Sequence, residues 1–140
     1  MSGQDRTLSL VLFSGTDDRL SAAAILAVGA AAMGRPVNVF LQYWALDAFR
    51  ADRIRKDHGV APEGGPEGLS LMQRMAGEGR SQHWSDMLWQ AKDIGEVGIH
   101  ACSLSMDVFG ITKDDLDPIV DGVWGVAAFT AAATGQVLFI

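Results

Sequence analysis

The chain of 140 residues contains a single cysteine, Cys102, so no intrachain disulfide can form. The fold therefore cannot depend on oxidation. Because disulfides belong to oxidising compartments, their exclusion makes a reduced, cytoplasmic setting the simplest expectation. The thiol remains as a free chemical group, and its role is the main question that the sequence raises.

Histidine is almost as scarce as cysteine. His58, His83 and His100 lie far apart, and none of them forms the His-x-x-x-His spacing of a helical metal site. A structural zinc usually takes four ligands, so no metal is expected. The glycine clusters at residues 64–65 and 77–79 lack both the Walker spacing and the G-x-G-x-x-G pattern after a strand. No bound cofactor is expected either.

Basic residues are outnumbered, with 11 Lys and Arg against 17 Asp and Glu and a formal net charge of −6. Nucleic-acid binding requires a basic face, so a nucleic-acid partner is disfavoured. The one candidate membrane segment, residues 20–33, is short and rich in alanine. A membrane span needs about 20 strongly apolar residues. We therefore expect a packed helix there and no membrane segment.

What is present is the composition of one globular domain, with 49% hydrophobic and 20% charged residues. Apolar runs alternate with helical patterns. Strands are predicted at residues 7–13, 36–41, 97–101, 123–124 and 136–140. Helices are predicted at residues 20–33, 46–55, 85–94, 103–109, 113–120 and 125–134. This alternation indicates an α/β fold whose parallel sheet carries helices on both faces.

The stretch 57–68 is rich in glycine and proline and is the longest expected loop. A helical turn is predicted after it, at residues 69–75. A loop of this length is expected to be mobile and to cover a neighbouring part of the molecule.

Cys102 follows a short apolar strand and precedes a short helix that Ser103 and Ser105 could cap. A thiol at a helix start faces free N–H groups and the positive end of the helix dipole. Such a setting lowers the pKa of a cysteine from about 8.5 toward neutrality. The carboxyl end of a parallel strand is also where ligand crevices form. The alternative is a buried cysteine that only packs.

Two neighbours of the cysteine have open roles. His100 is two residues earlier and shares a strand face with it, so it could steer protons or hold an anion, or be a half-buried strand-end histidine. Asp107 lies beyond the first turn of the helix. It could raise the pKa of the thiol, or it could orient the helix or pair with Lys113.

The ends of the first two predicted strands should lie at the same sheet edge as Cys102. Gly15 and Asp17 follow the first strand and form either a crevice wall or a simple helix cap. Tyr43 and Trp44 follow the second strand and form either an apolar wall beside the thiol or a contact between subunits.

Three ordered segments resemble the DsrE/DsrF-like proteins. The most specific is Ala-Cys-Ser-Leu-Ser-Met-Asp-Val-Phe-Gly-Ile at residues 101–111, which resembles the cysteine motif of that family. Residues 30–40, with the Tyr-Trp pair that follows, resemble its first helix, second strand and aromatic corner. Residues 123–129 and 137–140 resemble its closing helix and strand. Within the family, the chain looks most like the DsrE2-type branch linked to sulfur trafficking.

The resemblance implies a three-layer α/β fold with a five-stranded, mainly parallel sheet, and a homo-oligomer such as a trimer or hexamer. It also implies that Cys102 accepts and passes on sulfane sulfur as a persulfide or thiosulfonate. The implied partners are TusA-type sulfur carriers and rhodanese-like sulfurtransferases. Some relatives have a second cysteine and this chain has none. Sulfur release must therefore use a partner's thiol, a second protomer or a small thiol.

Two other functions remain compatible with the sequence. One is a non-catalytic, flavodoxin-like module that binds a small ligand or a nucleotide at its sheet edge. The other is a structural subunit in which the cysteine only fills space.

Overall fold

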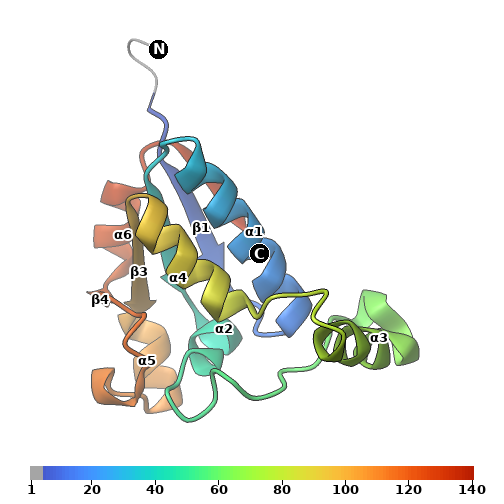
Figure 1. The fold of residues 1–140 in the computed structure, drawn as a ribbon. Coiled ribbons are helices and arrows are strands. Elements are labelled where there is room, and N and C mark those ends of the chain that lie inside the picture. The colour runs from blue at the N-terminus through green and yellow to red at the C-terminus, as the bar shows by residue number, and fades with distance from the viewer. Residues whose placement is uncertain (1–4) are drawn as a thin grey trace.

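The computed structural model describes residues 5–140 as a sheet with helices on both sides (Figure 1). Its strands are β1 (Leu8–Leu12), β2 (Val37–Leu41), β3 (Val97–Cys102), β4 (Gly122–Trp124) and β5 (Gln136–Phe139). Their order across the sheet is β4-β3-β2-β1-β5, and every neighbouring pair is parallel. The predicted α/β class with a five-stranded parallel sheet is confirmed.

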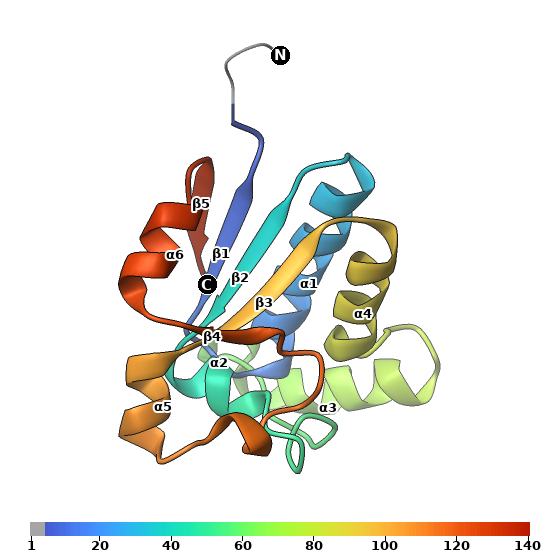
Figure 2. The ribbon, with the colours of Figure 1, turned by 90° about the vertical axis from the view of Figure 1, so that its left-hand side faces the viewer.

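Six α-helices connect these strands within the described residues. They are α1 (Asp17–Ala32), α2 (Tyr43–Ala48), α3 (Gly65–Gly77), α4 (Trp84–Ile94), α5 (Ser103–Phe109) and α6 (Val126–Ala132). In Figure 2, α1 and α4 cover one face of the sheet and α6 covers the other. Helices α2 and α5 lie together at the carboxyl ends of the strands, and α3 projects from that end of the molecule (Figure 1).

Helix α1 lies close to the sheet and to α4 because its inward positions hold alanine. Ala23, Ala24 and Ala27 are at most 1% exposed. A Cβ placed on Gly95, where α4 ends, would lie 2.8 Å from the Cβ of Ala31. Small side chains therefore set the distance between the two helices.

Two hydrophobic clusters flank the sheet. The larger lies between the sheet and the helices α1 and α4, and its strand residues include Leu10, Leu12, Val39, Leu41 and Ile99. The smaller lies on the α6 face and consists of Val11, Phe40, Cys102 and Phe129. The single cysteine therefore belongs to the smaller core.

Two predicted helices have different bounds in the structure. The helix expected at residues 46–55 is α2, which begins at Tyr43 and ends at Ala48. The chain then turns to pair with residues 115–117, through bonds such as that from Ala51 N–H to the Asp115 carbonyl at 2.9 Å. The helix expected at residues 113–120 is only a 3₁₀ turn over Lys113–Asp115. Asp117 precedes a proline, which disfavours helical backbone there.

The predicted long loop is shorter than expected. A 3₁₀ turn occupies Pro62–Gly64, and α3 begins at Gly65, with Pro66 in its first turn. Proline fits that position because its missing N–H would have no helical partner. The helical turn expected at residues 69–75 is part of this 13-residue helix.

Gly15 lies where the loop after β1 crosses the backbone that follows β2, and a Cβ there would be 2.4 Å from the carbonyl oxygen of Trp44. We predict that Gly15→Ala lowers the free energy of unfolding by about 2 kcal/mol, because the backbones must separate. Urea denaturation measures this change. Gly77→Ala is the matched control, since a Cβ there meets no atom within 4 Å. Wild-type stability of the Gly15 variant would contradict the prediction.

Candidate functional site

Cys102 ends β3 and is the N-cap residue of α5. Its backbone is extended, with φ −72° and ψ 119°, and its side chain makes no capping hydrogen bond. The strand-to-helix junction predicted for the thiol is confirmed. β3 lies between β2 and the edge strand β4, so the junction belongs to an internal strand of the sheet.

The thiol is covered. Cys102 is 5% exposed and packs in the cluster that contains Val11, Phe40 and Phe129, with Trp124 against its margin. The rings of Phe40 and Phe129 are stacked, with their centroids 4.5 Å apart. Within residues 5–140, no hydrogen bond reaches the sulfur. The expectation of a thiol open at a cleft mouth is therefore wrong for the single chain, because α6 folds back over this face.

His100 lies on the same face of β3 as Cys102, two residues earlier. Its ring stacks on that of Trp124, with centroids 3.6 Å apart and planes 2° apart. Burial lowers the pKa of His100 below its usual value; Asp121 opposes this and Lys92 adds to it. This shift favours the uncharged ring, and an uncharged, stacked imidazole binds an anion poorly.

The three residues of α5 that were predicted to support the site lie in different surroundings. Ser105 is 1% exposed and points into the protein, while Asp107 is exposed. Ser103 lies at the turn before α6, since its Oγ would be 3.9 Å from a Cβ on Gly125. The ion pairs found within residues 5–140 do not include one between Asp107 and Lys113. The considered pairing is therefore not formed.

Gly15, Tyr43 and Trp44 meet at the carboxyl ends of β1 and β2. Tyr43 begins α2 with φ 44°. Its ring lies edge-on to that of Phe109 of α5, with the ring centroids 5.8 Å apart. The ring of Trp44 also packs on that of Phe109, with the centroids 5.3 Å apart. Gly15 and Trp44 line a cavity of about 260 Å³. Cys102 does not line it, so this part of the expected crevice is separate from the thiol.

Asp17 belongs to a third group of residues. One carboxylate oxygen accepts the Trp84 indole N–H at 2.9 Å, and the other accepts the His58 backbone N–H at 2.9 Å. The N-cap residue of α1 is Thr16, and its side chain makes no capping bond. Asp17 therefore anchors the segment after α2 and the start of α4, and it does not cap the helix.

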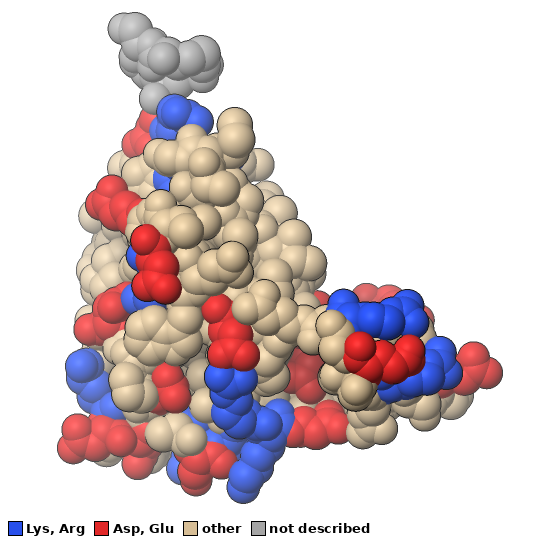
Figure 3. Space-filling model, in the orientation of Figure 1, with Lys and Arg blue, Asp and Glu red and all other residues tan. Residues whose placement is uncertain are grey.

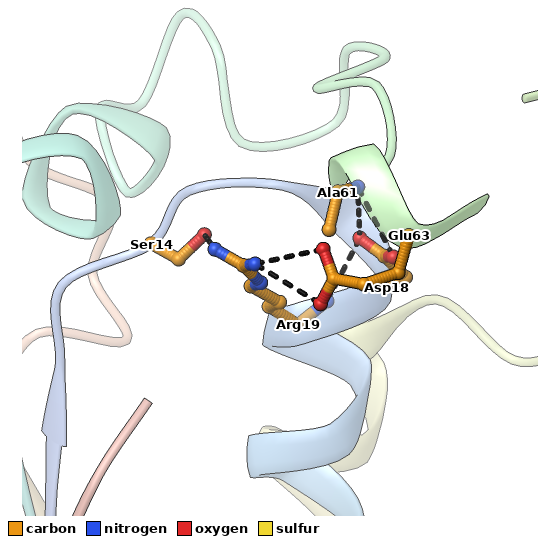
Figure 4. A network of polar contacts seen from close by, with 5 residues as sticks. All are labelled: Ser14, Asp18, Arg19, Ala61 and Glu63. Atoms are coloured by element: carbon orange, nitrogen blue, oxygen red, sulfur yellow. Dashed lines mark hydrogen bonds and ion pairs between the residues drawn. The ribbon is translucent and has the colours of Figure 1, made fainter. Parts of the chain in front are cut away.

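The next two residues of α1 extend this anchor (Figure 4). Asp18 accepts the Ala61 backbone N–H at 3.0 Å, and Arg19 pairs with Glu63 and donates to Ser14. Burial raises the pKa of Asp18, but the nearby Thr16 hydroxyl and hydrogen bonds from the backbone N–H groups of Ala61 and Arg19 outweigh it and hold that pKa below its usual value. The acidic start of α1 is thus occupied in fixing the segment that leads to α3.

A second cavity lies beyond this anchor, between α3 and the body of the protein. Its volume is about 420 Å³, and Asp17, Leu69, Met72 and His83 are among its lining residues. It is on the α1 side of the molecule, whereas Cys102 packs on the α6 face. The structure therefore distributes the predicted site residues over three places rather than one.

The residues that enclose the thiol were not found from the sequence. Phe129 comes from a helix near the end of the chain, and Phe40 and Val11 come from two other strands. Their common face follows from the parallel register, which aligns Val11 with Phe40 and Phe40 with His100. Alternation along each strand indicates which of its residues share one face of the sheet. It does not indicate the register, which decides which residues of neighbouring strands lie side by side.

No helix within residues 5–140 has the length and apolar character required to cross a membrane. The same residues contain no cluster of three or more His, Cys, Asp or Glu side chains placed to bind a metal ion.

Two solved structures have the same fold. The protein of unknown function MTH1491 from Methanobacterium thermoautotrophicum is similar with a TM-score of 0.60 and 15% identity, covering 97% of this chain and 100% of that one. The YchN protein from E. coli is similar with a TM-score of 0.56 and 14% identity, covering 98% and 100%. These likenesses concern the architecture.

Sequence comparison identifies the family. The chain is 32% identical over 154 aligned positions to the uncharacterized protein YrkE of Bacillus subtilis (strain 168), covering 95% of this chain and 94% of YrkE. The sequence profile of the DsrE/DsrF/DrsH-like family matches residues 4–63 and 60–139. With nearly its whole length matched, the chain belongs to the DsrE/DsrF/DrsH-like family.

Proposed function

We propose that this protein is a sulfur-relay protein that carries sulfane sulfur on Cys102. Family membership supports a role in sulfur transfer. The observation that carries the assignment is the position of the single cysteine, at the junction between the internal strand β3 and the helix α5. The thiolate is the form of cysteine that attacks sulfur.

Loading is an exchange at sulfur. The Cys102 thiolate attacks the outer sulfur of a donor persulfide, a new S–S bond forms, and the donor S–S bond breaks. The donor leaves as a thiolate, and Cys102 becomes a persulfide. With tetrathionate, attack on a central sulfur expels thiosulfate and leaves a thiosulfonate on Cys102. Neither exchange needs a separate oxidant or reductant.

The burial of Cys102 requires that its cover move before a donor can reach the sulfur. Phe129 is the one buried residue of α6, Val126–Ala132. One aromatic ring therefore provides most of the apolar attachment between α6 and the sheet. Helices with few buried contacts are the elements that open at low free-energy cost. We infer that α6 swings away from β3 during loading and unloading.

Release of sulfur uses a thiol from outside the chain, since Cys102 is the only cysteine. TusA-type carriers and rhodanese-like sulfurtransferases are the partners proposed, in the reducing environment of the cytoplasm. Both present a cysteine to which a persulfide sulfur can pass by the same exchange.

The protein is also proposed to form a homo-oligomer, a trimer or a hexamer. Apolar side chains near the carboxyl ends of the strands are exposed, among them Trp44 at 58%, Leu104 at 68% and Val108 at 57%. Contiguous exposed apolar surface marks a protein–protein contact.

The burial of Cys102 also favours a second candidate, in which the cysteine only fills the smaller core and the protein is a structural subunit. Free cysteine is among the most buried residue types. The two candidates differ in whether the native, folded protein takes up sulfur.

Mass spectrometry of the intact protein tests the assignment. After treatment with a persulfide donor or with tetrathionate, we expect the wild-type chain to gain the mass of one sulfur atom or one thiosulfonate group at Cys102. Cys102→Ser removes the nucleophile and should gain neither. Addition of a small thiol should reverse the gain. Sulfur uptake by the serine variant, or none by the folded wild type, would reject Cys102 as the carrier.

The opening of α6 has its own test. Phe129→Ala removes the ring that stacks on Phe40, so we expect alkylation of Cys102 by iodoacetamide to become at least about tenfold faster, the ratio that corresponds to about 1.4 kcal/mol of easier opening. Phe109→Ala is the matched control, because Phe109 packs on Tyr43 and Trp44 and not on the cysteine. Equal rates for both variants would contradict a cover held by Phe129.

A further inference from the structure

The outward side of α1 carries an uninterrupted apolar stripe. Its members recur at the spacing of one helix face, and every one of them is exposed. We call this set the α1 stripe: Ala22, Ile25, Leu26, Gly29, Ala32 and Met33. Three of the large side chains are strongly exposed, Ile25 at 59%, Leu26 at 40% and Met33 at 68%. No charged or hydroxyl side chain belongs to the stripe.

Nothing in the described part of the chain covers this stripe. The other sides of α1 are already buried, with Ala23, Ala24 and Ala27 against the sheet and α4. Figure 3 shows the surface over α1 without charged side chains, whereas charges gather toward the end of the molecule where α2 and α3 lie. A continuous apolar helix face of this kind marks a contact with another macromolecule.

The order of side chains makes the stripe complementary to itself. If a second α1 runs antiparallel about an axis between Ala27 and Val28, position 26 faces position 29 and position 33 faces position 22. Leu26 then lies opposite Gly29, and Met33 opposite Ala22. A Cβ at Gly29 would meet no atom within 4 Å, so there is open space at this position. Leu26 and Met33 therefore each meet a small residue, as interdigitating helices require.

The charges at the two ends of α1 are complementary in the same arrangement. Asp18 and Glu63 lie at its first turn, where Glu63 pairs with Arg19. Arg6 donates to the carbonyl of Met33 at its last turn, and Arg35 follows there. Antiparallel pairing brings the acidic end of one helix to the basic end of the other. Parallel pairing would place like charges together, which is unfavourable.

We propose that the α1 stripe is a two-fold interface at which a second copy of this chain packs its own α1 antiparallel to the first. The contact is isologous, with each copy supplying the same residues. The inference deepens the proposed homo-oligomer and rests on it, but it does not depend on sulfur transfer by Cys102. A two-fold contact makes the number of subunits even, which distinguishes a hexamer from a trimer.

Sedimentation of purified variants tests the interface. Leu26→Glu places two charges at the centre of the contact, and we expect the mass of the assembly to fall by half. Leu71→Glu is the matched control, since Leu71 is an exposed leucine of α3, 43% exposed and outside the stripe; it should keep the wild-type mass. An unchanged mass for the Leu26 variant, or a monomeric or trimeric wild type, would overturn the proposal.

Cross-linking tests the antiparallel register, in a Cys102→Ser background that removes the native thiol. Leu26→Cys and Gly29→Cys are made as separate proteins. When the two are mixed and oxidised, we expect disulfide-linked heterodimers to form several times faster than either homodimer. Predominant homodimers of the Leu26 variant would contradict the register. Because the Leu26→Glu protein should still load sulfur on Cys102, failure of the interface and failure of the sulfur proposal give different results.

Discussion

The stacking of Phe129 on Phe40 packs α6 against the sheet and covers Cys102. The cysteine, the two rings and Val11 form a core of four buried residues, far smaller than the core beneath α1 and α4. A small core gives a weak attachment, because apolar stabilisation follows the area buried. On the proposed function, this arrangement protects the sulfur beneath a cover that is only weakly attached. A persulfide is easily lost to stray thiols, and shielding between transfers suits a carrier.

The remaining polar groups near the carboxyl ends of the strands serve the scaffold. Asp17 joins Trp84 to the backbone at His58, and Asp18 holds Ala61. These bonds fix the segment from which α3 projects. His100 is stacked on Trp124, and burial lowers its pKa. The chemistry proposed for the site thus rests on the thiol, its place at the start of α5 and the movement of α6, without help from a neighbouring charge.

The sequence predicted the parts of the fold that depend on local pattern. The alanine-rich helix α1, the alternation of strands and helices and the junction at Cys102 follow from periodicity and from residues such as Gly34 that end helices. The prediction of a helix over residues 113–120 was wrong, because Pro118 disfavours helical backbone at the residue before it. That proline was visible in the sequence. The sequence left open whether Cys102 is buried and could not decide it, since Phe129 meets Phe40 only through the register of distant strands.

Transfer of sulfur to a partner tests the central claim most directly. The protein would be loaded with isotopically labelled sulfane sulfur, freed of excess donor and mixed with a TusA-type carrier in its thiol form. The account predicts that the label leaves Cys102 and appears on the cysteine of the carrier in equal amount. Label that stays on this chain, or that appears only as free sulfide, would contradict a relay.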